Sequence, residues 1–205
     1  LTQDHVPQRL NSFTSIPIQN STLTVEVIQA CGLQEAARAS QKHIPQLEYE
    51  TKNGVNPFVV FRVFDDHLYN DEHLVQSDFQ TPIVGRNFSP NWHYSKGLRF
   101  LFNEDSYQFL ESGEAEFMIF HHFSQAVADS VPSRNVLLGV AKVVLTPLLL
   151  KSSGIRDWFT IYSPDEKIAV GAVEIQITLD EATRRILKLN TADDDAISLD
   201  LSSDS

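Results

Sequence analysis

The side chains that could do chemistry in this chain do not form a catalytic set. The adjacent histidines His121 and His122 are candidate metal ligands, but neighbouring residues of a strand point to opposite faces, so the two rings do not converge on one ion. The single cysteine, Cys31, lies between Ala30 and Gly32 with no motif that supplies a base. A nucleophilic thiol needs such a neighbour, so we interpret Cys31 as a small buried side chain.

The acidic pairs of the chain indicate solvated turns rather than general acid–base catalysis. Asp65–Asp66 and Glu104–Asp105 both follow segments that we expect to be strands. No Gly-x-Ser-x-Gly, phosphate-binding loop or Gly-x-Gly-x-x-Gly motif occurs, and the chain has only 8 glycines with which to build one. We therefore predict that the chain is not an enzyme and holds no cofactor.

The overall charge argues against a nucleic acid as partner. The 205 residues carry 16 Lys and Arg against 27 Asp and Glu, a formal net charge of −11, whereas phosphate binding needs a concentrated excess of basic side chains. One cysteine can form neither an internal disulfide nor a thiolate zinc site, so we expect a reducing, cytoplasmic compartment. The longest apolar runs are far shorter than the roughly 20 residues that span a bilayer.

Alternating apolar and β-branched segments predict a mostly β domain. The clearest is 171–179, in which apolar residues recur at every second position. Turns and long loops separate these segments and little of the chain has a helical period, which is typical of an antiparallel β-sandwich. The predicted strands are 23–28, 58–64, 74–83, 97–102, 115–120, 136–145 and 171–179.

Two short segments predict helices. Residues 34–44 are rich in helix formers up to Pro45, and residues 180–189 begin with acids and end near bases, which suits a helix dipole. Residues 191–205 are acidic and Ser-rich, and we interpret them as a disordered tail because they are too polar to fold alone. We thus expect an N-terminal extension at 1–20, one domain at 21–190 and the tail. The chain shows no signal peptide and no initiator Met, so we expect a fragment of a longer protein.

Seven short motifs occur in the order found in one known family. They are Leu23-x-Val25-x-Val27-x-x-Ala30-x-Gly32-Leu33, Asn56-Pro57-Phe58-Val59, Phe88-Ser89-Pro90-Asn91-Trp92, Phe117-Met118-Ile119-Phe120-His121-His122-Phe123, Leu138-Gly139-Val140-Ala141, Trp158-Phe159-x-Ile161 and Gly171-x-Val173-x-Ile175-x-Ile177. Through these motifs residues 21–180 resemble the C2 domain. The resemblance implies an all-β, eight-stranded antiparallel C2-type β-sandwich, with a short helical insert after the first strand and a short C-terminal helix.

The resemblance also implies where a calcium site would lie, in the loops at one end of the sandwich. Calcium takes six to eight oxygen ligands, and C2 domains supply about five Asp side chains from two loops. The matching positions of this chain are neutral: Thr51, Asn56, His121, Phe123 and, before Leu138, Asn135 or Val136. Asp129 lies in the same loop, but one carboxylate is too few. We therefore predict no calcium binding.

Calcium-independent lipid binding by a C2 domain needs a basic patch on the concave strands. Residues 57–110 should hold that patch, but they contain four basic against seven acidic residues. Because each clustered cation contributes about 1 kcal/mol of attraction to an anionic leaflet, we expect weak or no membrane binding. A peripheral module that binds acidic phospholipids without calcium is the alternative.

Within the family, the insert after Leu33, the His121-His122 pair and residues 58–64 resemble the divergent C2 domains of large centriolar and ciliary scaffold proteins. That narrower resemblance implies a non-catalytic, calcium-independent module for protein interaction or structure. Its place would be a large intracellular scaffold in centriole distal-end or cilium assembly. Its partners would be proteins, and its location the centriole, centrosome or basal body.

Aromatic residues in or beside loops are candidates for partner contact, since aromatic side chains are enriched in protein interfaces. They are Phe64, Tyr69, Phe88 and Phe123. The helical insert at 34–44 and the loop at 124–135 are the segments that the sandwich needs least. We expect a partner surface to use them.

Overall fold

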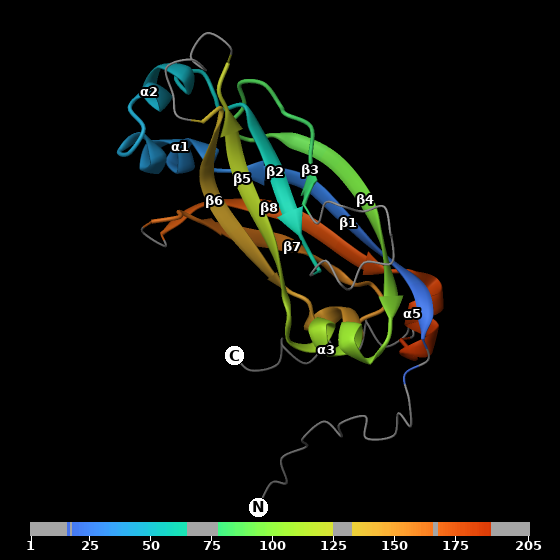
Figure 1. Cartoon of the computed structure of the whole chain (residues 1–205). Helices are drawn as coiled ribbons and strands as arrows, with labels where there is room; N and C mark the ends of the chain where they lie inside the picture. The colour runs from blue at the N-terminus through green and yellow to red at the C-terminus, as the bar shows by residue number, and fades with distance from the viewer. Residues whose placement is uncertain (1–15, 17, 65–77, 125–132, 166–167, 190–205) are drawn as a thin grey trace, which may run out of the picture.

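Eight antiparallel strands form one sheet that curls over into a β-sandwich (Figure 1). The structure is a computed structural model that describes residues 16, 18–64, 78–124, 133–165 and 168–189. The strand order is β3-β2-β5-β6-β7-β8-β1-β4, which confirms the predicted fold class. The strands are β1 (Gln19–Cys31), β2 (Pro57–Arg62), β3 (Phe79–Gln80), β4 (Asn91–Phe102), β5 (Glu114–His122), β6 (Asn135–Val144), β7 (Ile155–Tyr162) and β8 (Ala169–Leu179).

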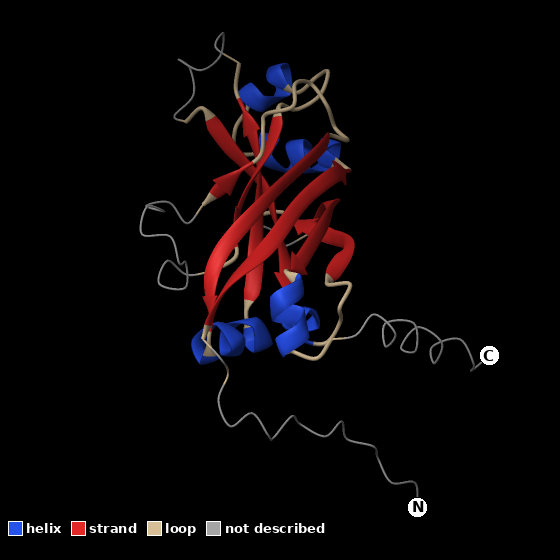
Figure 2. Ribbon diagram, turned by 90° about the vertical axis from the view of Figure 1, so that its right-hand side faces the viewer, coloured by secondary structure: helices blue, strands red, loops and turns tan. Residues whose placement is uncertain are grey.

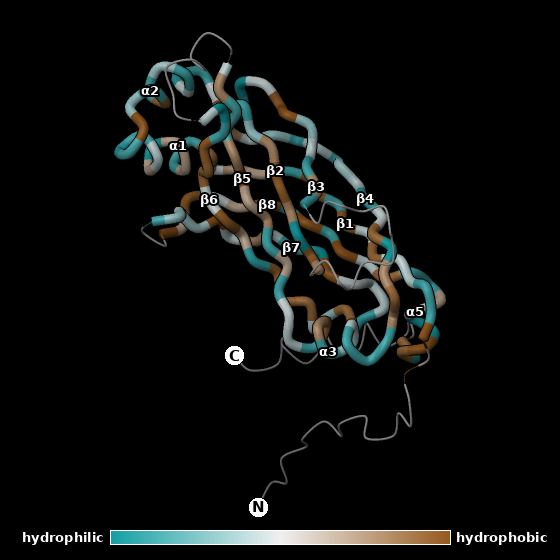
Figure 3. Tube along the Cα trace, viewed as in Figure 1, coloured by the Kyte–Doolittle hydropathy of each residue, from teal (hydrophilic) through white to brown (hydrophobic). Residues whose placement is uncertain are grey.

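The core lies between the two layers of the sandwich. In β5, Ala115, Phe117, Ile119 and His121 are buried while the residues between them are more exposed, as the two-residue period of a strand requires. Apolar residues run along the strands in Figure 3, with hydrophilic ones between them. Phe61 of β2 stacks on Phe117 with ring centroids 5.5 Å apart, and each such buried ring contributes about 1.5–3 kcal/mol.

The two layers meet at β6 and β7. The pairing of these strands consists of Val140 opposite Tyr162, and Gly139 lies beside that pair. A Cβ atom on Gly139 would lie 2.5 Å from Cγ2 of Ile161 and 2.8 Å from the carbonyl oxygen of Tyr162. Because nonbonded atoms do not approach so closely, only glycine lets β7 pass β6 at this point.

A bulge interrupts the alternation of β1. The register of β1 shifts between Val27 and Gln29 against both β4 and β8. Strict alternation from Leu23 would place Ile28 on the outer face, but Ile28 is buried. The extra residue of a bulge reverses the faces of the residues that follow it, so the sequence pattern alone assigned Ile28 wrongly.

The insert after β1 contains two helices rather than the single helix predicted at 34–44. Helix α1 (Leu33–Gln41) follows Gly32, which has a left-handed backbone with φ of 77°. Helix α2 (Gln46–Glu50) begins after Pro45, because proline is accepted at the start of a helix but not in its interior. The insert packs its apolar side against the sandwich through Leu33, Ala36, Ala37 and Leu47, which are all buried.

Helix α3 (Glu104–Ser112) was missed, because Glu104 and Asp105 were interpreted as turn residues after a strand. The Asn103 side chain accepts a hydrogen bond from the Ser106 amide at 3.0 Å, and the Ser106 hydroxyl accepts one from the Asn103 amide at 2.9 Å. This capping box starts the helix, and the two acids lie in its first turn, where the helix dipole favours them. The Asn-x-x-Ser pattern was the available signal.

The C-terminal helix is shorter than the predicted 180–189. Helix α5 (Glu181–Ile186) is capped by Asp180, which accepts a hydrogen bond from the Thr183 amide at 2.8 Å and another from the Thr22 amide of β1. The 3-10 helix η2 (Thr146–Leu149) follows β6. Figure 2 shows helices gathered at the two ends of the sandwich: α1 and α2 at one, α3 and α5 at the other.

Strand boundaries differ from the predictions mainly at the edge of the sheet. The strand predicted at 74–83 is only the two residues of β3, beginning at Phe79, and residues 65–77 lie outside the described part. Strand β4 begins at Asn91, six residues before the predicted start at Gly97. No helix within the described ranges is long and apolar enough to cross a bilayer.

Replacing Gly139 by Ala tests the close passage of β6 and β7. We expect the free energy of unfolding to fall by about 1–3 kcal/mol, because the added methyl group must displace β7. Gly97→Ala is the matched control, since its new Cβ would meet no atom closer than Cγ2 of Thr22 at 3.4 Å. Urea denaturation measures both variants, and equal losses of stability would contradict this role of Gly139.

Candidate functional site

The neutral positions that match the calcium ligands of C2 domains lie together at the end of the sandwich where β2 begins, β5 ends and β6 begins. The insert with α1 and α2 lies at the same end (Figure 1). Asn56 precedes β2, His121 lies near the end of β5, and Asn135 opens β6. The structure thus brings together residues from three segments that are distant in the sequence.

Asn56 connects three of the segments at this end. Its backbone amide donates a hydrogen bond to Nδ1 of His121 at 3.0 Å. Its side-chain Nδ2 donates to the carbonyl oxygen of His122 at 3.0 Å, and its Oδ1 accepts from the amide of Arg86 at 3.0 Å. An aspartate here would have no N–H to offer His122, so the amide side chain suits this position and a carboxylate does not.

His121 is a buried, neutral side chain. Because Nδ1 accepts the Asn56 amide, the ring proton is on Nε2. That atom is buried and has no hydrogen-bond partner among the described residues. Burial lowers the pKa of the imidazole from 6.5 to about 4, although the negative charge of Glu50 partly opposes the shift. The ring meets Phe123 edge to face, with centroids 4.9 Å apart.

Thr51 and Phe123 serve the packing of the insert. The Thr51 hydroxyl donates to the carbonyl oxygen of Leu47 at 2.7 Å and accepts from Nε2 of Gln41 at 3.1 Å. Phe123 is buried in a small cluster with Leu47 and Val136. Both residues therefore hold α2 against the sandwich, and neither presents an oxygen to a cation.

The remaining polar groups at this end also pair with one another. Nδ1 of His122 lies 2.8 Å from Oδ1 of Asn135. The carboxylate of Glu50, on α2, accepts hydrogen bonds from both the amide and the hydroxyl of Ser124, at 2.8 and 3.1 Å. Sequence reasoning missed the Glu50–Ser124 contact, because the two residues lie 74 positions apart.

This set of ligands does not fit calcium. A hard divalent cation needs several carboxylate oxygens, whereas the side chains gathered here are two amides, two imidazoles, two hydroxyls, a phenyl ring and the single carboxylate of Glu50. The side-chain amide of Asn56 and the carboxylate of Glu50 already have hydrogen-bond partners. Within the described ranges no group of three or more His, Cys, Asp or Glu could hold a metal ion. Asp129 lies outside the described residues.

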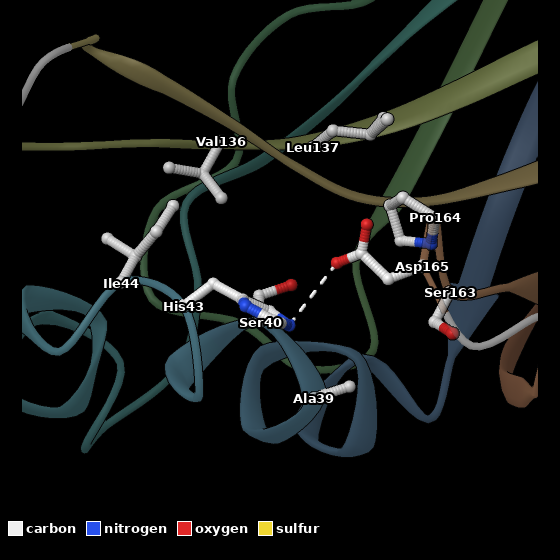
Figure 4. A pocket seen from close by; sticks show the side chains of 9 residues that line it. All are labelled: Ala39, Ser40, His43, Ile44, Val136, Leu137, Ser163, Pro164 and Asp165. Atoms are coloured by element: carbon white, nitrogen blue, oxygen red, sulfur yellow. Dashed lines mark ion pairs between the residues drawn. The ribbon is translucent and has the colours of Figure 1, made fainter.

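A small cavity of about 70 Å³ lies beside this network, between α1, the start of β6 and the turn after β7 (Figure 4). Its polar feature is an ion pair between Nε2 of His43 and Oδ2 of Asp165 at 3.4 Å. Ser40 and Ser163 also line it. The cavity is too small for an organic ligand, and both side chains are mostly exposed, so the contact contributes little to stability.

Two of the predicted contact residues are buried, which corrects that prediction. Phe64 lies in the core, with its ring centroid 4.8 Å from that of Phe100, and Phe123 lies in the cluster under α2. Phe88 is half-buried and packs against the main core. Tyr69 lies outside the described residues. Both buried rings closely follow a strand, and the adjacent layers and helices cover them.

Some exposed residues were not identified from the sequence pattern. Tyr49 on α2 is 86% exposed, although it is aromatic and lies in the expected insert region. Cys31, which we interpreted as buried, is exposed at the end of β1, because the bulge changes which residues of β1 face outward. The opposite orientation of His121 and His122, by contrast, is confirmed by the burial of only the first.

Comparisons with known proteins agree with this architecture. The sequence is 32% identical to C2 domain-containing protein 3 of Mus musculus, and equally to that of Homo sapiens, over 159 residues that cover 71% of this chain and 6% of each relative. The structure is similar to a C2 domain of plant extended synaptotagmin 1, with a TM-score of 0.50, 15% identity, and coverage of 78% of this chain and 94% of that one. No family model matches the chain.

The buried His121 makes stability depend on pH. The unfolded chain takes up a proton near pH 6.5, whereas the folded chain does so only near pH 4, because burial lowers the pKa. The free energy of unfolding should therefore decrease by about 3 kcal/mol as the pH falls from 6.5 to 4. We expect His121→Gln, which keeps an acceptor for the Asn56 amide, to lose this part of the decrease.

His122→Gln is the matched control, since it leaves the buried His121 in place and removes only the smallest of the causes that shift its pKa, so most of the decrease should remain. Urea denaturation at several pH values gives the three curves. Identical pH profiles for the wild type and His121→Gln would show that His121 is not the group responsible.

Proposed function

The chain is a divergent C2 domain, and from this premise we propose that it is a non-catalytic, calcium-independent module for protein interaction or structural support in a large intracellular scaffold. The proposal rests on the residues at the loop end of the sandwich, where C2 domains bind calcium. The positions that would hold calcium are neutral, and their polar atoms hydrogen-bond to one another and to the backbone. The C2 fold is compatible with binding either a protein or a membrane.

Calcium independence is supported by the cost of dismantling the network. A cation at the loop end would have to replace the bonds of Asn56 to His122 and Arg86 without gaining carboxylates in return. Each buried polar group left unpaired costs about 1–3 kcal/mol. The side-chain hydrogen bonds and the cluster of Leu47, Phe123 and Val136 hold together loops that a cation would otherwise join.

The similarity to C2 domain-containing protein 3 supports the proposal that this domain is part of a large scaffold protein. The matched segment is 6% of that protein's length, as expected for one module of a long chain. The resemblance to divergent C2 domains of centriolar and ciliary scaffolds supports a role in centriole distal-end or cilium assembly. We propose protein partners there and a cytoplasmic location at the centriole, centrosome or basal body.

Charge pairing supports a protein partner over an acidic membrane. Arg62 of β2 pairs with Asp78, Nη2 to Oδ1 at 2.8 Å. The Lys96 ammonium of β4 lies over the ring of Phe79, 5.4 Å from its centroid. Both cations lie on strands where a lipid patch would form and both are engaged within the domain. The charge of Arg62 is offset by Asp78, which reduces its attraction to an anionic surface.

The most suitable surface for a protein partner is the outer side of α1 and α2, which we call the insert surface. It presents the aromatic ring of Tyr49 with Glu48 beside it, and the ion pair of Glu35 with Arg38 on α1. Aromatic residues with a polar rim are typical of protein interfaces. This surface replaces the buried Phe64 and Phe123 as the candidate contact.

Calcium should leave the stability of the chain unchanged. A site saturated at one hundred times its dissociation constant would add about 2.7 kcal/mol to the free energy of unfolding, which denaturation in calcium and in chelator would detect. Saturable stabilisation that disappears in Asp129→Asn would contradict the proposal.

Sedimentation with anionic vesicles tests the lipid alternative. Binding of the chain to these vesicles without calcium and at physiological salt would favour that alternative.

Tyr49→Ser tests the insert surface. We expect the variant to change the free energy of unfolding by less than about 0.5 kcal/mol, since the ring is exposed, but to reduce proximity labelling of partners several-fold in a ciliated cell. Ile18→Ser is the control, because Ile18 is 73% exposed before β1. Equal labelling by wild type and both variants would exclude the insert surface, and no enrichment of centriolar proteins would overturn the proposed setting.

A further inference from the structure

The strands β6 and β7 each leave one edge open. They pair only at Val140 and Tyr162 and diverge from that point toward η2, whereas their other edges pair with β5 and β8 along most of their length. On the side between the two strands, every second residue of 141–144 in β6 and of 155–161 in β7 therefore presents a backbone donor and acceptor that no strand of the described part satisfies. Open edges of this kind can accept an added strand.

A groove follows these open edges. It consists of two adjoining hollows of about 740 and 440 Å³ that share Lys142, Asp157 and Phe159 in their walls. The hollow near the Val140–Tyr162 pair is aromatic, with Trp158 43% and Tyr162 48% exposed. Large apolar side chains in a groove beside an open strand edge are unusual on a free surface and indicate an occupant.

The hollow near η2 is basic. Lys142, Lys151 and Arg156 line it, with Asp157 as the only carboxylate among its described lining residues. Lys142 is neutralised by Glu114 and Glu116, at 3.3 and 3.2 Å, which raise the pKa of its ammonium. Arg156 pairs with Glu174 at 3.0 Å. Lys151 is exposed, and no carboxylate of the described residues lies within ion-pair distance of it.

The C-terminal sequence has the matching order of charge and apolar residues. Asp193, Asp194 and Asp195 come first, and Ile197, Leu199 and Leu201 then alternate with polar residues. Such alternation gives a strand one apolar face. We propose that residues 193–201 of this chain bind in the groove as an added strand, with the aspartates at the basic hollow and the apolar face on Trp158 and Tyr162.

The end of the described chain lies on the correct side for this docking. Arg184 of α5 donates a hydrogen bond to the carbonyl oxygen of Ser152, next to the basic hollow, at 3.1 Å. Residues 190–201 can span up to about 40 Å when extended, which exceeds the length of the eight residues of β7. A segment that starts at this end and runs toward Tyr162 is antiparallel to β6, the pairing that added strands commonly adopt.

This surface is separate from the insert surface, so its test is independent of the proposed function. Amide hydrogen exchange on the full 205-residue chain measures it. We expect the amides of 141–144 that face the groove, and alternate amides of 196–201, to exchange roughly tenfold more slowly in the wild type than in Ile197→Asp/Leu199→Asp. Ser198→Asp/Ser202→Asp adds the same charge on the opposite face of the segment and should keep the protection. Lys151→Glu should reduce it.

Three outcomes would overturn the docking. The first is equal exchange in the wild type and in the Ile197→Asp/Leu199→Asp variant. The second is loss of protection in the Ser198→Asp/Ser202→Asp control to the same extent. The third is protection that rises with protein concentration together with a dimeric mass by light scattering, which would assign the groove to a second copy of the chain.

Discussion

The arrangement of the segments at the loop end depends on the hydrogen bonds of Asn56. Through its backbone amide and both side-chain atoms, this one residue joins the start of β2, the end of β5 and the loop before β4. Because its partners are a buried neutral imidazole and two backbone groups, the arrangement disfavours a carboxylate at the position where a calcium site would require one. Burial in the same packing keeps His121 neutral, whereas Thr51 and Phe123 carry no ionisable group.

The two surfaces that we propose for binding are built differently. At one end the insert covers the loops with a second small apolar cluster and leaves Tyr49 as its exposed feature. Between the two layers, β6 and β7 diverge from the contact that Gly139 allows, and the groove between them carries aromatic and basic side chains. The proposed insert surface and the proposed docking groove thus share no residue.

Much of the strand framework could be predicted, because a strand with one buried face repeats its apolar residues with period two. That rule located β5, β6 and β8 within a few residues. It failed at Ile28, where a bulge shifts the faces, and at α3, where a capping box of Asn103 and Ser106 starts a helix directly after a strand. It also failed at β3, whose two residues at the edge of the sheet are too short to show a period.

The sequence alone shows that the positions matching the calcium ligands of C2 domains are neutral, and a calcium site cannot be made there without acidic side chains. Which side chains lie on the surface was decided only by the tertiary structure. Phe64 and Phe123 follow strands in the chain just as exposed residues would, but Phe100 and the insert helices cover them. Burial depends on segments distant in sequence, such as those that carry Glu50 and Ser124, and no local pattern reports their approach.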